Sequence, residues 1–397
     1  MNKEPNKTLL AFTTAALSLM SLSSRSALAA SADESTTISY RYSSYNEDAL
    51  PAKSVGEGDE NRYKIGIHQV RFKTAVSEVT EIAVDMTSES MSGASPWYIV
   101  PDLEGNPVQV MSGASIVEER TAVDAGLYTY SDTVRTHLAF NVSSENDYES
   151  YGVSASYAQS FNENNTEFEI GINAAQDYIE PSGVDDYPGR IAEASKTVGG
   201  ISLGLTRVIS RSSIINYAIA YSYHDGYLSD PYKQAFVAGN IVADARPSTR
   251  QQWTLSTLYR KNFENKNAAL HLDYRYFGSD WETSSHTLEL SWYQNMGDSW
   301  QISPQLRLYS QSQSAFYQNY YLQQRADGYY SSDYRLSAFN AASAQLKLSK
   351  FFGFGAFHIS CESYRSKSAE DGDTAKLKAN PALTSFVRFT AGVDLNF

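Results

Sequence analysis

The chain has 397 residues and a formal net charge of −13 at pH 7, from 32 basic and 45 acidic side chains. A surface with this excess of negative charge repels nucleic acid and argues against a nucleic-acid partner. The only cysteine, Cys361, rules out an internal disulfide, so stability must come from burial and hydrogen bonding. The chain holds 29 Tyr, 17 Phe and 5 Trp, an abundance typical of alternating strands with interfacial aromatic side chains.

Residues 1–29 have the pattern of a cleaved export signal. Lys3 and Lys7 form a basic start, residues 9–22 are largely apolar and small, and Ala27-Leu28-Ala29 offers a cleavage site. The apolar stretch is shorter than the roughly 20 residues that a membrane-spanning helix needs. We therefore expect export to the periplasm and a mature chain of residues 30–397.

Sixteen later segments alternate between apolar and polar residues with a period of two. In the clearest, residues 150–161, the side chains of Tyr151, Val153 and Tyr157 share one face. The segments are 36–45, 63–72, 76–86, 116–130, 133–143, 150–161, 166–178, 196–209, 213–223, 251–262, 268–277, 285–295, 299–310, 333–350, 355–365 and 384–397. This pattern predicts an all-β fold, a single transmembrane antiparallel β-barrel of about sixteen strands that occupies residues 30–397.

The last segment, 384–397, predicts how the barrel closes. Val387, Phe389 and their alternate neighbours form an apolar face, whereas Arg388 belongs to the polar face. A strand at an edge needs a partner, and a closed barrel provides one by pairing the last strand with the first. We expect this segment to pair with the strand around Tyr40, with Arg388 in the lumen.

The connections between segments differ systematically in length. Short, turn-like connections follow the even-numbered segments, at 73–75, 131–132, 162–165, 210–212, 263–267, 296–298 and 351–354. Long ones follow most odd-numbered segments, at 46–62, 87–115, 179–195, 224–250, 311–332 and 366–383, with two short exceptions near Glu145 and Asp280. Outer-membrane barrels have short periplasmic turns and long extracellular loops, so we expect the outer membrane of a Gram-negative bacterium. A soluble β-sandwich is the alternative.

The polar faces of the strands carry charge that should point into the lumen. A charge on the lipid face near the midplane would cost about 2–4 kcal/mol. Asp273, Arg275, Glu289 and Arg307 lie on neighbouring segments and should form one cluster of acids and bases. The candidate lumen residues are Arg120, Asp124, Asp273, Arg275, Glu289, Arg307, Tyr309, Arg335 and Arg388. They form either a structural salt-bridge network or a charged constriction that selects solutes.

One long loop contains a short repeat. Residues 91–95 and 111–115 both read Met-Ser-Gly-Ala-Ser. Glycine and serine favour tight turns, so the two copies are interpreted as matched turns that frame a folded flap.

The sequence offers no convincing catalytic or cofactor motif. The six histidines are far apart and lack metal-site spacing, and the best serine–histidine combination is His286 beside Ser284 and Ser285. We expect no enzymatic activity, no bound cofactor and no metal.

A family resemblance is carried by several loop and strand motifs. These are residues 92–97, 111–115, 226–233, Arg246-Pro247, Tyr274-Arg275-Tyr276 with Asp280-Trp281 and His286, residues 307–317, and residues 332–336. Together they resemble the domain-of-unknown-function family 3570 over most of the mature chain. The resemblance implies an exported protein of a Gram-negative bacterium and supports the barrel, but it implies no site residues.

Two functions follow from these observations. The first is a pore or channel for small polar solutes or ions, because about sixteen strands leave room for an aqueous passage. The alternative is a non-conducting barrel that acts as receptor or scaffold for a ligand, a surface partner or a periplasmic carrier protein. Expected partners are outer-membrane lipid, lipopolysaccharide and, during biogenesis, the barrel-assembly machinery; a homo-oligomer or a periplasmic partner stays open.

Overall fold

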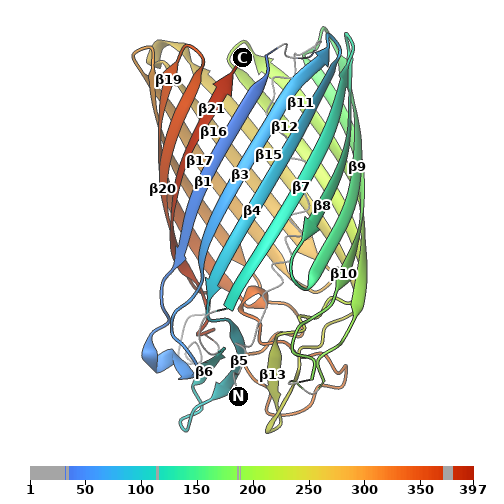
Figure 1. Ribbon diagram of the computed structural model, residues 1–397, viewed down its shortest axis with the longest axis vertical. Helices are drawn as coiled ribbons and strands as arrows, with labels where there is room; N and C mark the ends of the chain where they lie inside the picture. Colours follow the sequence, from blue (N-terminus) through green and yellow to red (C-terminus); the bar gives the residue numbers. More distant parts are fainter. Residues whose placement is uncertain (1–31, 33–34, 113–115, 186, 188, 370–378) are drawn as a thin grey trace.

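In the computed structural model, one closed barrel of sixteen antiparallel strands forms the body of the protein (Figure 1). The structure describes residues 32, 35–112, 116–185, 187, 189–369 and 379–397, so the expected signal segment 1–29 lies outside the described residues. In chain order, the barrel strands are β1 (Thr37–Glu47), β3 (Lys64–Ser77), β4 (Thr80–Gly93), β7 (Ile116–Tyr130), β8 (Val134–Ser144), β9 (Tyr148–Phe161), β10 (Thr166–Ile179), β11 (Ala194–Ser210), β12 (Ser213–Gly226), β15 (Thr249–Phe263), β16 (Ala268–Ser279), β17 (Ser284–Met296), β18 (Trp300–Gln311), β19 (Phe339–Phe352), β20 (Gly355–Ser368) and β21 (Ser385–Asn396). Each corresponds to one predicted segment, which confirms the fold class.

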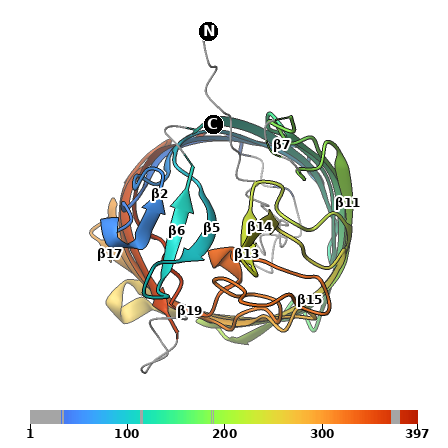
Figure 2. The ribbon, with the colours of Figure 1, turned by 90° about the horizontal axis from the view of Figure 1, so that it is seen from below.

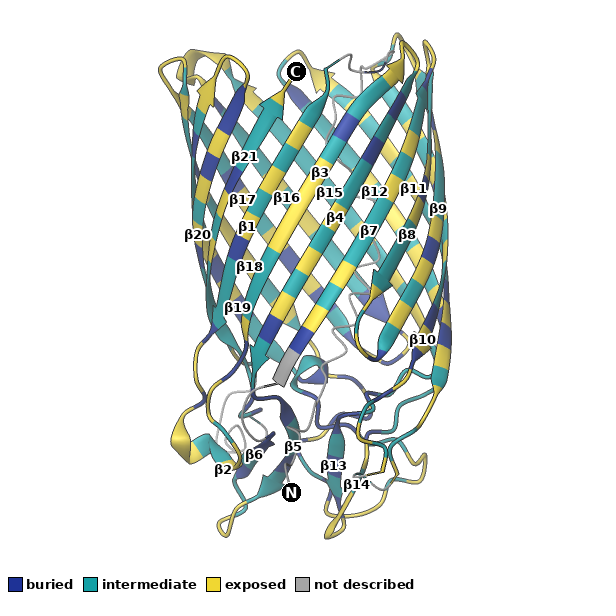
Figure 3. Cartoon of the chain, viewed as in Figure 1, coloured by how far each residue is buried: buried dark blue, intermediate teal, exposed yellow. Residues whose placement is uncertain are grey.

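The alternation of apolar and polar residues assigns the two faces of the barrel wall (Figure 3). On β18, Leu306 and Leu308 point outward and are each 45% exposed, whereas Arg307 between them points inward to an ion pair with Glu289. The outer face therefore presents apolar side chains, and the charges lie inside, where they avoid lipid. No helix among the described residues is long and apolar enough to cross a membrane.

The first and last strands close the barrel as predicted. β1 and β21 are antiparallel, and Tyr40 pairs with Val393. Phe389 is exposed on the outer face, and Arg388 reaches Glu362 of β20 on the inner face. Backbone bonds between Thr36 and Phe397 extend the pairing beyond both strands.

Turns and loops segregate to opposite ends of the barrel, as expected (Figure 1). Several predicted boundaries are wrong; β4, for example, runs from Thr80 to Gly93 where strand 76–86 is predicted. Side-chain contacts explain two of them. The predicted turn 73–75 is part of β3, which continues to Ser77, because Lys73 forms an inward ion pair with Glu81 of β4. The predicted strand 333–350 begins only at Phe339, because Asp333 caps the short 3-10 helix η3 (Tyr334–Leu336) by accepting a hydrogen bond from the Arg335 N–H.

The long loops pack into a layer across one mouth of the barrel (Figure 2). This layer contains the 3-10 helix η1 (Ala52–Ser54), a sheet of β2 (Val55–Glu57), β5 (Pro96–Pro101) and β6 (Pro107–Met111), and the hairpin β13 (Gln234–Val237) and β14 (Asn240–Ala243). Apolar clusters of large side chains lie here, one of them formed by Trp281, Phe316, Tyr317 and Leu336. We call loops 48–63, 94–112, 227–248 and 312–338 the loop cap. The opposite mouth has short turns, including the 3-10 helix η2 (Glu264–Lys266).

The two copies of the repeat meet at the base of the β5–β6 hairpin. The Ser95 N–H donates to Ser112 Oγ at 2.8 Å, and the Ser112 N–H donates to the Ser95 carbonyl at 2.8 Å. Gly93 has a φ of +132°, and a Cβ there would lie 2.5 Å from the carbonyl oxygen of Arg62. The two copies thus flank the folded β5–β6 hairpin, but residues 91–93 end β4 and Met111 ends β6, so the described part does not form the predicted matched turns. Residues 113–115 lie outside the described residues.

Candidate functional site

Three of the four residues of the predicted acid–base cluster come together on the inner wall of β16 to β18, whereas Arg275 forms no ion pair with a described residue. Asp273 faces Glu289 across β16 and β17, and Glu289 faces Arg307 across β17 and β18. Arg307 Nε lies 3.4 Å from Glu289 Oε2. Arg260 of β15, which is not among the predicted residues, forms an ion pair with Asp273. Arg260 Nη2 donates to Asp273 Oδ2 at 3.0 Å. Most charge in this cluster is therefore neutralised between neighbouring strands.

Arg120 and Asp124 lie on a different part of the wall, on β7. Arg120 Nη1 donates to Glu89 Oε2 of β4 at 2.9 Å. Asp124 faces Asp85 of β4, whose Oδ1 lies 3.6 Å from Arg71 Nε of β3. The structure therefore does not bring these two residues together with the cluster on β15 to β18.

Arg388 also pairs with a carboxylate on a neighbouring strand, close to where the first and last strands meet. Its Nη2 donates to Glu362 Oε2 of the neighbouring strand at 2.7 Å. On the other side of β21, Arg41 lies 2.8 Å from Asp394. Ion pairs between neighbouring strands are thus the usual state of the inward charges.

Arg335 does not occupy its predicted position. The alternation predicts it inside the fourteenth strand, but it lies in η3, within the loop cap and above the wall. Its Nη2 donates to Asp230 Oδ2 at 2.6 Å, and its Nε donates to both oxygens of Asp333. Strong local ion pairing therefore replaces the strand that the alternation predicted.

Arg335 belongs to a buried ion cluster that joins two long loops. Arg246 lies 2.7 Å from Asp244 and 3.0 Å from Asp333. Burial alone would raise the pKa of the Asp333 carboxyl, but the surrounding guanidinium and ammonium groups hold that pKa well below its ordinary value. We call this set of three acids and three bases the cap ion cluster, formed by Asp230, Asp244, Asp333, Lys233, Arg246 and Arg335. Its formal charges cancel.

Tyr334 extends the cap ion cluster to the two remaining loops. The Arg62 guanidinium lies 5.2 Å and the Lys233 ammonium 5.7 Å from the centre of its ring. Lys233 also donates to the Pro96 carbonyl at the start of β5. Burial lowers the pKa of Lys233 to about 8. Contacts through this one region therefore hold all four loops of the loop cap together.

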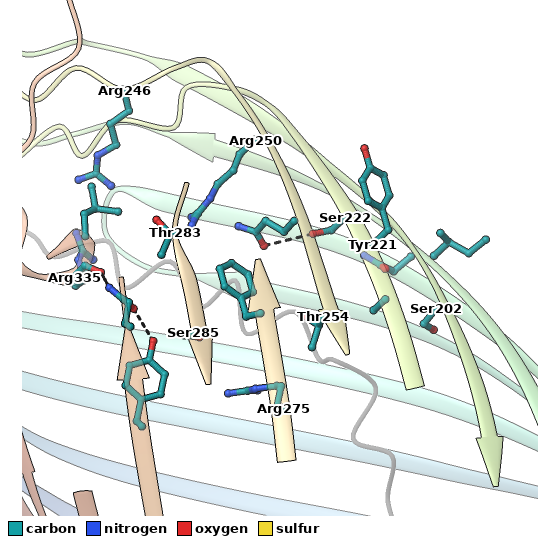
Figure 4. Close-up of a pocket in the computed structure, with 18 of the residues that line it drawn as sticks. Ser202, Tyr221, Ser222, Arg246, Arg250, Thr254, Arg275, Thr283, Ser285 and Arg335 are labelled. Carbon is teal, nitrogen blue, oxygen red and sulfur yellow. Dashed lines mark hydrogen bonds between the residues drawn. The ribbon is translucent and has the colours of Figure 1, made fainter. Parts of the chain in front are cut away.

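Beneath the cap ion cluster, a cavity of about 530 Å³ opens on the inner wall of β10 to β18 (Figure 4). Of the predicted lumen residues, Arg275, Tyr309 and Arg335 line it; the other six do not. Arg246 and Asp333 of the cap ion cluster also reach it, and Tyr309 donates to Gln311 Oε1 at 2.6 Å. The cavity thus lies where the wall meets the loop cap.

The sequence profile of the family described as "Protein of unknown function (DUF3570)" matches residues 9–391. The chain belongs to the DUF3570 family. This confirms the resemblance drawn from the loop and strand motifs. No functionally curated protein matches the sequence.

Among solved structures, this DUF3570 chain is similar to outer-membrane barrels at very low identity. The siderophore receptor PirA of Pseudomonas aeruginosa is 8% identical, with a TM-score of 0.42; the likeness covers 91% of this chain and 61% of the receptor. The chain thus spans about three fifths of that receptor. A BenF-like porin from Pseudomonas fluorescens Pf-5 is 8% identical with a TM-score of 0.44, covering 92% of this chain and 99% of the porin. The bacterial polysaccharide outer membrane secretin is 8% identical with a TM-score of 0.48, and the likeness covers 91% of this chain and 98% of the secretin.

Sequence reasoning missed Arg250 and Thr283, which also line the cavity. Arg250 fell in a predicted loop, but it lies on β15, where the outward Trp253 and Leu255 place even-numbered residues inside. Extending the predicted strand by one residue toward the loop would have included Arg250. Thr283 lies in the short β16–β17 connection, which carries no periodic signal.

The serine and histidine of the best candidate pair in the sequence do not both point into the cavity. His286 lies on the outer face of β17, where its Nδ1 is 2.8 Å from the Tyr274 hydroxyl. Ser285, the next residue back, points inward and lines the cavity. The alternation of the strand therefore separates these two side chains.

Asp147 makes one contact of the loop region sensitive to pH. It lies in the β8–β9 turn and accepts a hydrogen bond from the Tyr232 hydroxyl, which itself accepts from the Ser182 N–H at 3.0 Å. Burial raises the pKa of Asp147 to about 6, although the bond from Tyr232 lowers it. Because the folded pKa exceeds the ordinary value of about 3.9, this group stabilises the contact fully below about pH 4 and loses that contribution as pH rises through about 6.

We expect the hydrogen-exchange protection of the Ser182 amide, corrected for its intrinsic rate, to fall between about pH 4 and pH 7. In Asp147→Asn the same protection should be nearly independent of pH over this range, because the carboxyl is gone. Equal pH profiles for the two proteins would contradict the assigned role of Asp147.

Proposed function

We propose that this DUF3570 protein is a channel of the Gram-negative outer membrane for small polar solutes or ions. The turn end would face the periplasm, and the loop cap would face outside. The observation that carries the proposal is the inner wall, which is polar and ion-paired along its length while the outer face is apolar and exposed. A barrel of sixteen strands is wide enough for an aqueous passage.

A receptor is the second candidate, and the loop cap favours it. The loops pack through buried aromatic clusters and a neutral ion cluster, and they lie across the mouth (Figure 2). A rigid layer of this kind suits a surface that binds a ligand or partner. In either function, outer-membrane lipid and lipopolysaccharide are the partners we expect for the apolar outer face.

Reconstitution in a planar lipid bilayer tests the channel directly. Stepwise ion conductance on insertion of the purified full-length protein would support a channel. A folded barrel, verified by its β-sheet circular dichroism, that inserts but stays electrically silent would overturn the channel and favour the receptor.

The wall pair Arg307–Glu289 should influence ion selectivity in opposite directions when each partner is removed. Arg307→Ala leaves the Glu289 carboxylate unpaired and should favour cations, whereas Glu289→Ala leaves a guanidinium and should favour anions. A unit charge at contact distance in water is worth about 1 kcal/mol, so we expect roughly two- to fivefold changes in the permeability ratio. Reversal potentials across a potassium chloride gradient measure this ratio.

The outward variant Leu306→Ala is the matched control, because it changes the same strand without changing lumen charge. If both charge variants keep the reversal potential of the unaltered protein, the Arg307–Glu289 pair is structural only.

A further inference from the structure

Two arginines that line the cavity lack the carboxylate partner that the other inward arginines of the wall have. Inward arginines elsewhere have a carboxylate partner at 3.6 Å or less, as found at Arg41, Arg71, Arg120, Arg135, Arg260, Arg307 and Arg388. Arg250 and Arg275 are the exceptions: neither forms an ion pair with a carboxylate in the part of the chain that the structure describes. The cap ion cluster above them is formally neutral and supplies no net negative charge. Asp280 and Glu289 act on Arg250 and Arg275, but neither carboxylate forms an ion pair with them.

The two arginines differ in how they are held. Arg250 donates through Nε to Ser279 Oγ at 3.1 Å, and its guanidinium lies 4.3 Å from the centre of the Trp281 ring. These contacts fix the side chain but leave its charge unpaired. Arg275 makes no hydrogen bond or ion pair with any described residue. Because a guanidinium cannot give up its proton, each can be neutralised only by an anion.

Hydroxyl groups without partners lie beside these arginines. Thr283 lines the cavity, is 4% exposed, and its Oγ1 has no hydrogen-bond partner among the described residues. Thr287 stands in register between Arg275 of β16 and Tyr309 of β18, and its buried Oγ1 is likewise unpartnered. A buried hydroxyl without a partner costs about 1–3 kcal/mol, so a ligand oxygen that accepts from it would recover this cost.

We infer that this cavity binds a small organic anion whose carboxylate or phosphate group pairs with Arg275 and Arg250 (Figure 4). Thr283 and Ser285 would donate further hydrogen bonds, and Phe277 and Leu336 would contact the apolar part of the ligand. The cavity volume of about 530 Å³ is within the range of small-molecule sites. As the selectivity site of a channel the cavity rests on the proposed function, but anion binding itself does not.

Isothermal titration of the full-length protein in detergent with succinate and with inorganic phosphate tests the inference. The unaltered protein should bind at least one probe, and the tighter of the two identifies the preferred group. Arg275→Gln and Arg250→Gln should each weaken binding about tenfold or more, because each removes the charge of a charge-assisted hydrogen bond but keeps a polar side chain. Thr283→Val should weaken it less, by about threefold to tenfold.

Arg71→Gln is the matched control: it removes the same charge from an inward position that does not line the cavity. It should bind the probe with unchanged affinity. The inference is overturned if the unaltered protein binds neither probe, or if Arg275→Gln and Arg250→Gln bind as tightly as Arg71→Gln. Failure of the channel is seen separately, as a silent bilayer while titration still detects binding.

Discussion

Replacing Asp333 by asparagine is expected to release the loop cap from the mouth of the barrel. Asp333 is 2% exposed and accepts hydrogen bonds from Arg335 and Arg246. The substitution removes the negative charge of Asp333 and places an amide group, which can itself donate, next to the two guanidinium groups. The cap ion cluster then contains three cations but only two carboxylates. Breaking a buried ion pair on one side costs about 3–5 kcal/mol. The loop cap should lose its docking while the barrel, held by its strand ladder, stays folded.

Two measurements can detect the release of the loop cap in Asp333→Asn. Amide hydrogen exchange should accelerate in residues 227–248 and 312–338 of Asp333→Asn but stay slow in the barrel strands. If the protein is a channel, single-channel conductance should rise, because the loops no longer narrow the mouth. Since the pKa of Asp333 is held below its ordinary value, the unaltered cap should keep this stabilisation at neutral pH and lose it only as pH falls below about 4.

Asp327→Asn supplies the control for Asp333. Asp327 lies in the same loop and pairs with Arg325, but it is at the surface. Surface ion pairs contribute about 0–1 kcal/mol, so exchange in the loop cap should hardly change. Equal exchange in the two variants would show that the cap ion cluster does not hold the loops.

Arginine at position 346 is expected to destabilise the barrel in lipid, whereas arginine at position 345 is not. Leu346, near the middle of β19, is 51% exposed on the outer face, opposite Cys361 of β20. Gln345 points into the lumen and faces Glu362. Leu346→Arg would place a charge against hydrocarbon at about 2–4 kcal/mol, while Gln345→Arg would gain an acidic neighbour.

Urea unfolding in lipid vesicles, followed by tryptophan fluorescence, measures this difference. The midpoint should fall clearly for Leu346→Arg and stay near that of the unaltered protein for Gln345→Arg. The comparison is closely matched, because the two positions are adjacent on one strand and receive the same side chain. If both variants unfold at the same urea concentration, the outer face does not contact lipid.

Most of the barrel could be predicted from local pattern. All sixteen segments became strands, the closing strand paired around Tyr40, and Arg388 and Arg307 took the inward face. The reason is that alternation places successive side chains on opposite faces, so a short window of sequence determines both the strand and its orientation. The errors lie at strand ends, where Lys73 and Asp333 make ion pairs that alternation does not describe.

The sequence by itself thus determined the strands, their faces and the two unequal ends of the barrel. Only the tertiary structure decided the site. Lys233 meets the Pro96 carbonyl 137 residues away, and Arg246 meets Asp333 87 residues away. Which inward arginine finds a carboxylate also depends on register between strands and on how the loops fold back, as Arg275 and Arg307 show. These contacts join distant parts of the chain, and periodicity, being a property of neighbouring residues, contains no information about them.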